Sequence, residues 1–255
     1  MIQTICFSKD RPSQLNTLFE SLEFFTDLND ISVLYKYSNI DFKKGYDKLI
    51  KKYSHIRFIE ETNFKQDILN MINHKKYLQF LTDDDIFINE FKGFNGFDDN
   101  ILSLSLRLGK NCIYCYTENK PMIVPEINNG IFEYNKIKNN GDWSYAYSLD
   151  GDIFDTKTML YLINKSFFFS PNTYEGYIQR FQIDSKPYKM ILDNQKLFNN
   201  PCNRVQQDCN NRFGKISADY LNQKFLEGFN IDLDYILKQK DKIDSPHYEV
   251  DIKLI

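Results

Sequence analysis

The fold of this chain is decided by residues 77–88, which read YLQFLTDDDIFI. Residues 77–82 form an apolar run of strand length, three consecutive aspartates follow it, and residues 86–88 are apolar again. A short apolar run of this kind predicts a buried strand. Ligands of open parallel sheets collect at the carboxyl ends of strands. The triplet Asp83-Asp84-Asp85 therefore stands where a binding site is expected.

The segments before this stretch alternate between short apolar runs and amphipathic stretches, the pattern of βαβ units and a largely parallel sheet. The predicted strands are residues 4–8, 31–37 and 56–60, and the predicted helices are residues 13–25, 45–53 and 64–72. Beyond the triplet we expect helices over residues 100–108, 157–164 and 217–227. The chain is therefore predicted to be an α/β protein.

Composition bounds the class of protein. The 255 residues, 42% of them hydrophobic, are enough for one large α/β domain. Lys and Arg number 32 against 35 Asp and Glu, dispersed along the chain, so nucleic acid is not expected as a partner. No signal peptide, no transmembrane run and an odd count of five cysteines lead us to expect a cytoplasmic protein.

Three adjacent carboxylates repel one another, and a bound divalent cation removes that penalty. If strand geometry continues through the triplet, Asp83 and Asp85 project to one face and Asp84 to the other. Two carboxylates two residues apart can serve one Mn²⁺ or Mg²⁺. The alternative is a solvated turn or a helix cap. The apolar flanks on both sides favour metal binding, because they anchor the site in the core.

Six short motifs, in this order along the chain, resemble those of GT-A-type glycosyltransferases, and more closely a family-two-like group found in bacteria and large viruses. They are FSKDRP at 7–12, LTDDDIF at 81–87, SLRLG at 105–109, SLDGDIF at 148–154, SPNTYE at 170–175 and NRVQ at 203–206. The resemblance implies the GT-A fold, a Rossmann-like, mixed and mostly parallel sheet flanked by helices, with a short C-terminal extension. It divides a single domain into a nucleotide-sugar-binding half, 1–117, an acceptor-side half, 118–230, and the extension, 231–255.

The activity that the resemblance implies is metal-dependent, inverting transfer of a sugar in glycan synthesis. The donor would be a nucleotide-diphosphate sugar, UDP- or GDP-linked, and the acceptor a hydroxyl of a glycan or another molecule. Asp83 and Asp85 fill the positions of the DxD motif, with Asp84 also beside the donor. Glu175 stands at the place of the general base that deprotonates the acceptor. Asp150, before a turn at Gly151, is the rival base or an acceptor-binding residue.

The remaining candidate residues surround these carboxylates. The loop Ser8 to Arg11 is implied to lie beside the nucleotide, and His247 is implied to return from the C-terminal extension as a third metal ligand. Lys9, Arg11 and Lys65 are candidates for phosphate contacts and Tyr37 for covering the base. Trp143 and Tyr145 are candidates for stacking on an acceptor sugar, although the alternation of aromatic residues there fits a half-buried strand equally well.

Two other classes of function stay open. A nucleotidyltransferase also uses paired aspartates and a cation at a strand end, but the Gly-rich phosphate loop often found near its first strand is missing from this sequence. A non-catalytic sugar-binding domain could keep the fold without the chemistry. The presence of Asp83, Asp85 and Glu175 favours the transferase.

Overall fold

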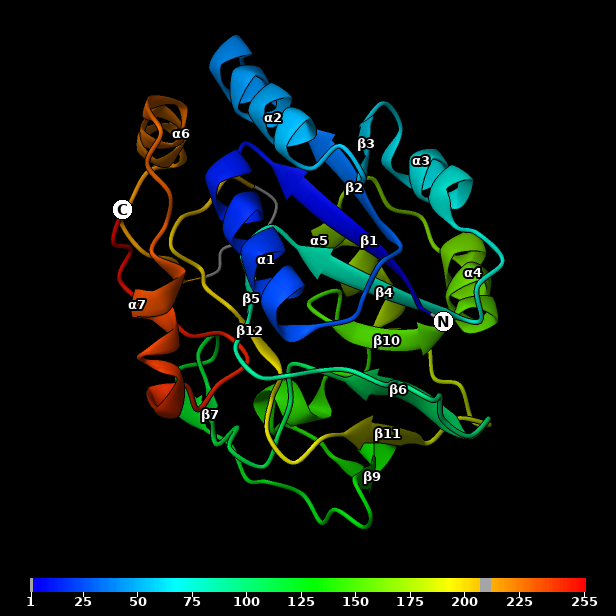
Figure 1. Ribbon diagram of the computed structural model, residues 1–255. Coiled ribbons are helices and arrows are strands. Elements are labelled where there is room, and N and C mark those ends of the chain that lie inside the picture. The colour runs from blue at the N-terminus through cyan, green and yellow to red at the C-terminus, as the bar shows by residue number, and fades with distance from the viewer. Residues whose placement is uncertain (1, 207–211) are drawn as a thin grey trace.

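The computed structural model describes residues 2–206 and 212–255. Its main sheet has eight strands: β1 Ile2–Lys9, β2 Ile31–Lys36, β3 Arg57–Glu60, β4 Tyr77–Thr82, β6 Ile101–Ser105, β9 Ile131–Glu133, β10 Asp152–Asp155 and β11 Tyr188–Ile191. Their order is β3-β2-β1-β4-β10-β6-β11-β9 (Figure 1). Pairing is parallel from β3 to β4 and between β6 and β11, while β10 and β9 run antiparallel to their neighbours. This confirms the predicted mixed, mostly parallel sheet.

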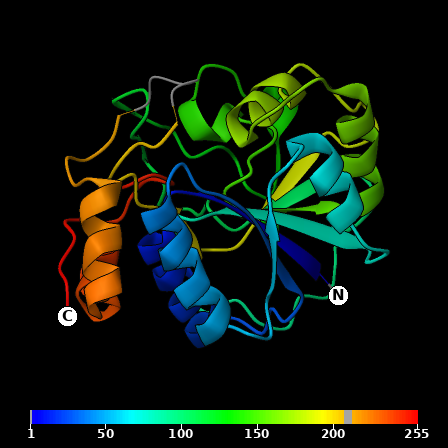
Figure 2. The same ribbon diagram turned by 90° about the horizontal axis from the view of Figure 1, so that it is seen from above.

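Helices cover both faces of the sheet. They are α1 Pro12–Phe25, α2 Ile40–Lys52, α3 Phe64–Met71, α4 Thr156–Lys165, α5 Pro171–Ile178, α6 Ala218–Glu227 and the short α7 Leu233–Leu237, with 3-10 turns at Tyr134–Lys136, Gly141–Ser144 and Lys240–Lys242. Figure 2 shows α1 and α2 in blue and α6 in orange on one side, and α3, α4 and α5 on the other. Each side has its own apolar core, so successive strand residues point to different cores: Ile5 and Phe7 to one, Cys6 to the other.

A third apolar core ties the end of the chain to the aspartate triplet. The strands β5 Asp85–Phe87 and β12 Leu197–Asn199 form a two-stranded ribbon, and a second ribbon joins β7 Tyr114–Cys115 to β8 Lys120–Pro121. Ile86 and Phe198 of the first ribbon pack against Ile236 and Val250 of the C-terminal segment. Residues 231–255 are thereby held next to the end of β4.

One predicted element is wrong. The helix predicted over residues 100–108 is replaced by the strand β6, which is followed by a bend at residues 106–107. Leu102, Leu104 and Leu106 alternate with Ser103 and Ser105, which is the period of two that a strand requires. All five residues of β6 are buried between the two helical layers. Within the described part of the chain, no helix has the length and apolar character that a membrane span needs.

Candidate active site

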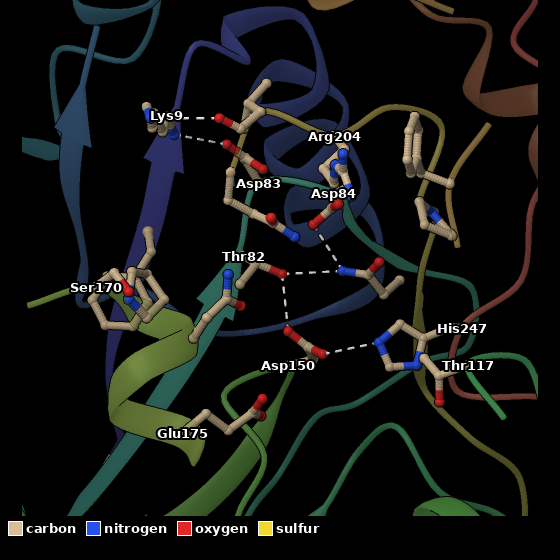
Figure 3. Close-up of a pocket in the computed structure, with 18 of the residues that line it drawn as sticks. Lys9, Thr82, Asp83, Asp84, Thr117, Asp150, Ser170, Glu175, Arg204 and His247 are labelled. Atoms are coloured by element: carbon tan, nitrogen blue, oxygen red, sulfur yellow. Dashed lines mark hydrogen bonds and ion pairs between the residues drawn. The ribbon is translucent and has the colours of Figure 1, made fainter. Parts of the chain in front are cut away.

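A cavity of about 610 Å³ opens at the carboxyl ends of β1, β2 and β4 (Figure 3). Its walls come from both predicted halves of the chain and from the C-terminal segment. Among the sequence candidates, those that line it are Ser8, Lys9, Arg11, Asp83, Asp84, Tyr145, Asp150, Glu175 and His247. These side chains therefore meet at the sheet edge where the sequence predicts a binding site, at the carboxyl end of β4.

The first wall is the loop between β1 and α1, held against the aspartate triplet. Asp83 accepts hydrogen bonds from Ser8 Oγ at 2.8 Å, from the Lys9 backbone N–H at 3.0 Å and from Arg11 Nη1 at 3.0 Å. Burial raises the pKa of Asp83 to about 7, against the opposing charge of Arg11. Asp10 has φ +56° and fixes the loop by accepting from the Ser38 N–H at 2.7 Å.

Asp84 and Asp85 differ from their expected placement, because the strand ends at Thr82 and the chain turns over Asp83 and Asp84. Asp84 lines the cavity and pairs with Arg11 Nη1 at 2.7 Å and Asn199 Nδ2 at 2.7 Å. Asp85 is fully buried outside the cavity lining and accepts from the Thr82 N–H at 2.8 Å. The predicted shared face of Asp83 and Asp85 is therefore wrong. The cavity-facing carboxylates of the triplet are Asp83 and Asp84.

Arg11 is engaged with protein groups. Its Nη1 contacts both Asp83 and Asp84, its Nε donates to Asn203 Oδ1 at 2.8 Å, and its Nη2 donates to the Asn203 carbonyl oxygen. Burial would lower the pKa of this guanidinium, but the two aspartates outweigh it and raise the pKa. Arg11 therefore neutralises the aspartate turn and fixes the position of the 203 segment, in addition to lining the cavity.

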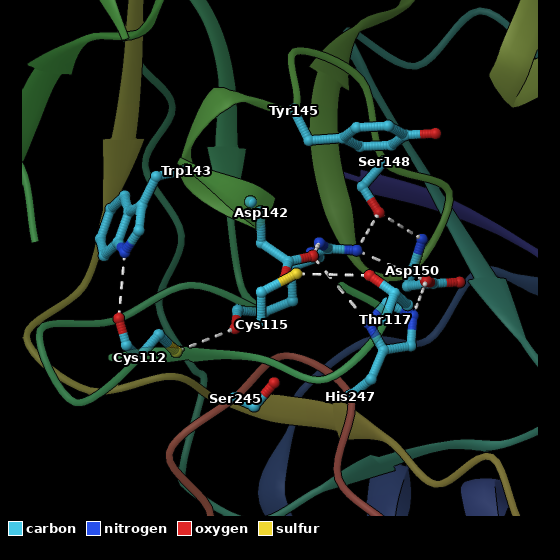
Figure 4. A network of polar contacts seen from close by, with 12 residues as sticks. Cys112, Cys115, Thr117, Asp142, Trp143, Tyr145, Ser148, Asp150, Ser245 and His247 are labelled. Atoms are coloured by element: carbon cyan, nitrogen blue, oxygen red, sulfur yellow. Dashed lines mark hydrogen bonds and ion pairs between the residues drawn. The ribbon is translucent and has the colours of Figure 1, made fainter. Parts of the chain in front are cut away.

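The second wall is built around Asp150, two residues before the start of β10. Asp150 accepts from Thr82 Oγ1 at 3.0 Å, and its other oxygen lies 3.3 Å from His247 Nε2 (Figure 3) and 3.5 Å from Arg107 Nη1. Figure 4 shows Asp150 and His247 within the wider polar network. Burial would raise the pKa of Asp150, but the bond to His247 and the charge of Arg107 lower it overall. The adjacent Gly151 has φ +91°, a turn conformation that favours glycine.

His247 reaches the cavity because the C-terminal segment runs beside β12. The Asn199 N–H donates to the Pro246 carbonyl at 2.8 Å, and the Tyr248 N–H donates to the Asn199 carbonyl at 3.0 Å. Burial would lower the pKa of His247, but its hydrogen bond with Asp150 raises it. Its Nδ1 is buried, has no hydrogen-bond partner among the described residues, and lies 3.9 Å from Asp142 Oδ1.

Glu175 lies on α5 and faces the cavity from below Asp150 in Figure 3. Ser170 caps the start of this helix by accepting from the Thr173 N–H at 3.2 Å, and a proline occupies the first helical position. Glu175 accepts from the Leu149 N–H at 2.9 Å. Burial, with the nearby charge of Asp150, raises the pKa of Glu175 to about 7. A carboxylate of that pKa is suited to exchange protons at neutral pH.

Three further sequence candidates, besides Asp85, lie outside the cavity lining, which corrects their expected roles. Tyr37 packs beside Tyr35 against the apolar core on the side of α1 and α2. Successive side chains of an extended segment point to opposite sides, so it is Lys36 that lines the cavity. Lys65 donates to the Ser166 carbonyl at 2.7 Å. Trp143 lies in a 3-10 turn, is fully buried, and donates from Nε1 to the Cys112 carbonyl at 3.0 Å (Figure 4). The expected alternating strand is absent at Trp143, which fills the core.

Sequence reasoning missed two residues that organise the site. Asn199 donates to Thr82, Asp84 and Asp85 through one amide nitrogen. Arg107, 3% exposed, donates to Ser148 Oγ at 2.8 Å and pairs with Asp142 as well as Asp150. Arg107 could have been found, because a charged residue in an apolar alternation requires a buried partner. Asn199 carries no such signal.

The site offers carboxylate and imidazole groups to a metal ion. Within residues 2–206 and 212–255, no group of three or more His, Cys, Asp and Glu side chains is already arranged to hold one. Asp84, Asp150 and His247 nevertheless all line the cavity, and hydrogen bonds through Thr82 and Asn199 link them. Carboxylate oxygens suit both manganese and magnesium, and a neutral imidazole beside them suits manganese better than magnesium.

Comparisons with known proteins bear on this site. No family model matches the sequence. The chain is 30% identical to the bifunctional glycosyltransferase pgtA of Dictyostelium discoideum over 75% of its own length, and it spans 30% of that protein. Two solved structures resemble it more weakly. One is the mannosyltransferase PcManGT from Pyrobaculum calidifontis in complex with GDP-Man and Mn²⁺, with a TM-score of 0.37 and 8% identity over 63% of this chain and 46% of that one. The other is an active-site mutant of LgtC, with a TM-score of 0.36 and 11% identity over 72% of this chain and 68% of that one. At such TM-scores neither likeness carries an argument about ligands. The sequence similarity makes this chain a homologue of part of a glycosyltransferase.

Proposed function

We propose that this chain is a metal-dependent glycosyltransferase that moves a sugar from a nucleoside-diphosphate sugar to an acceptor hydroxyl, with inversion. One observation carries the proposal beyond homology: the aspartate turn and Glu175 face the same cavity (Figure 3). Asp83 and Asp84 lie at one end, Thr82 and Asp150 lie between, and Glu175 lies at the other end. A donor bound at the turn would present its sugar toward the base.

The cation in this proposal would be held by Asp84, Asp150 and His247, with donor phosphates completing its coordination. Manganese and magnesium sites of this kind use one or two carboxylates plus substrate phosphates. The acidic groups around Thr82 outnumber Arg11 and Arg107, and the Nε2 of His247 lies 3.3 Å from Asp150. When bound, the cation stabilises the negative charge of the departing diphosphate. Asp83 and Asp85 would support the turn.

The proton is assigned to Glu175. As the acceptor oxygen bonds to the anomeric carbon, the bond from that carbon to the diphosphate oxygen breaks, and Glu175 takes the acceptor proton. Asp150 is the weaker base, because its oxygens already contact Thr82, His247 and Arg107 and its pKa is lowered. Tyr145 lies beside Glu175, and the Glu175 charge adds to burial in raising its pKa, so the phenol remains a hydrogen-bond donor.

In this proposal the two halves of the chain bind different substrates. Residues 1–117 would bind the donor through the Ser8 to Arg11 loop and the triplet, and residues 118–230 would bind the acceptor through Tyr145 and Asp150. Glycan hydroxyls are the acceptor class that suits an open cavity lined by aromatic and carboxylate groups.

A thermal-shift screen with UDP- and GDP-sugars, with and without Mn²⁺, tests the donor assignment. We expect a rise in Tm that requires both the sugar nucleotide and the metal. No shift with any of them would contradict the proposal. For a donor that binds, nuclear magnetic resonance of the product should show the anomer opposite to that of the donor. Retention of the anomer would remove Glu175 from the role of base.

A further inference from the structure

Part of the cavity lining has no role in the proposed mechanism. It lies at the carboxyl ends of β1, β2 and β3 and is formed by Phe7, Leu34, Lys36, Glu61 and Phe64, which we call the strand-end arm. Phe7 and Leu34 are register partners in neighbouring strands, and the rings of Phe7 and Phe64 lie 5.1 Å apart. The walls of the arm are therefore apolar, and its polar groups are Lys36 and Glu61.

Glu61 is held in place at this arm. Its backbone N–H donates to the Tyr35 carbonyl at 2.7 Å, which fastens it to the end of β2. Its side chain is 16% exposed, and one oxygen, Oε1, accepts from Lys36 Nζ at 2.9 Å. The lysine side chain is 53% exposed. Because partly exposed ion pairs contribute little to stability, the pair offers the cavity a fixed carboxylate and a movable cation.

The arm joins the aspartate turn directly. Ser8, which follows Phe7, donates to Asp83, and Lys9 is the register partner of Lys36. A nucleoside diphosphate with its phosphates at the turn would place its base in this arm, between apolar walls and the Lys36–Glu61 pair.

We infer that the strand-end arm selects guanine, so that the donor of the proposed reaction is a GDP-sugar; the inference rests on the proposed function. The argument is the pattern of donors and acceptors. The pairing edge of guanine carries two adjacent N–H donors and then the O6 acceptor, which complements the two oxygens of Glu61 and the ammonium of Lys36. Uracil presents one donor between two carbonyls. Adenine and cytosine place a ring acceptor next to their amino group, where a carboxylate would repel it.

Calorimetry of the whole chain with GDP, UDP, CDP and ADP in the presence of Mn²⁺ tests the inference. We expect GDP to bind at least about tenfold more tightly than the other three, since one bidentate pair discriminates by roughly 5- to 150-fold. Inosine diphosphate, which lacks the 2-amino group, should also bind less tightly than GDP. If UDP, CDP or ADP binds as tightly as GDP or more tightly, the guanine assignment is overturned, while the proposed transferase activity stands. No binding of any diphosphate overturns both.

A matched pair of variants locates the discrimination. Glu61→Gln should reduce the preference for GDP over UDP at least about tenfold, because an amide cannot accept both N–H groups through its two terminal atoms. Glu60→Gln changes the neighbouring residue of β3, which lies outside the cavity lining, and should leave the preference unchanged. An unchanged preference in Glu61→Gln overturns the inference.

Discussion

Replacing Glu175 by glutamine separates its proposed catalytic role from a structural one. The substitution keeps the size of the side chain and removes its ability to take a proton. Loss of a general base typically lowers the rate by about 10² to 10⁴. Because Glu175 has a pKa of about 7, wild-type kcat/KM should rise with pH and reach half of its plateau near that value. At pH 6 about a tenth of the enzyme would carry the ionised base.

Stability should change in the opposite sense. The pKa of Glu175 in the folded chain lies above the unfolded value, so its stabilising effect is present below the unfolded pKa. It is lost as pH rises through about 7. The shift corresponds to at most roughly 3 to 4 kcal/mol at high pH, and less if water reaches the carboxylate. Glu175→Gln should therefore unfold at a higher temperature than wild type at pH 8, with a smaller difference at pH 5.

The assay combines initial rates from pH 5.5 to 8.5 with metal-free thermal unfolding over the same range. Glu175→Gln should be slower at every pH, lack the wild-type inflection near pH 7, and be at least as stable as wild type at pH 8. A variant that retains wild-type kcat/KM would refute the assignment of the base. A variant that loses activity and stability together would indicate that Glu175 serves the fold.

Three further changes test the surrounding site. Asp84→Asn should weaken Mn²⁺-dependent binding of a nucleoside diphosphate at least about tenfold by calorimetry, since the carboxylate faces the cavity; unchanged affinity would assign the metal elsewhere. Arg11→Met should lower the free energy of unfolding by about 3 kcal/mol in urea at pH 8, because Asp83 and Asp84 lose their buried partner, and a loss below about 1 kcal/mol would contradict that role. Trp143→Phe should reduce stability by about 1 to 3 kcal/mol through the lost indole hydrogen bond and volume, while leaving acceptor KM unchanged in the remaining folded enzyme.

The first half of the fold could be predicted because its signals are local. The strand over residues 77–82 was predicted with its observed bounds, and the helix over 13–25 differs from α1 by one residue. In each of these segments the apolar residues follow a single spacing, that of a strand or that of a helix, and residues typical of turns mark its end. At residues 100–108 the alternation of leucine with serine is the period of a strand rather than of the expected helix, and Leu104 and Leu106 pack in one core.

The site could be located from the sequence but its geometry could not. A strand that ends in aspartates identifies a sheet edge, yet which carboxylate faces the cavity depends on where the strand stops. Thr82 is the last residue of β4, and the turn after it exchanges the directions of Asp84 and Asp85. Asn199, more than a hundred residues away in the sequence, holds this turn by donating hydrogen bonds to Asp84 and Asp85. No local pattern specifies such a contact.

The distant contacts also explain why the end of the chain belongs to the site. Asn199 links the aspartate turn by its side chain and the C-terminal segment by its backbone, so one residue sets both Asp84 and His247. Arg107 acts similarly on the other wall, where it pairs with Asp142 and Asp150. Because each of these buried charges would be costly without its partners, the walls form together or not at all. The acidic cavity is therefore assembled by residues that no single segment of the sequence contains.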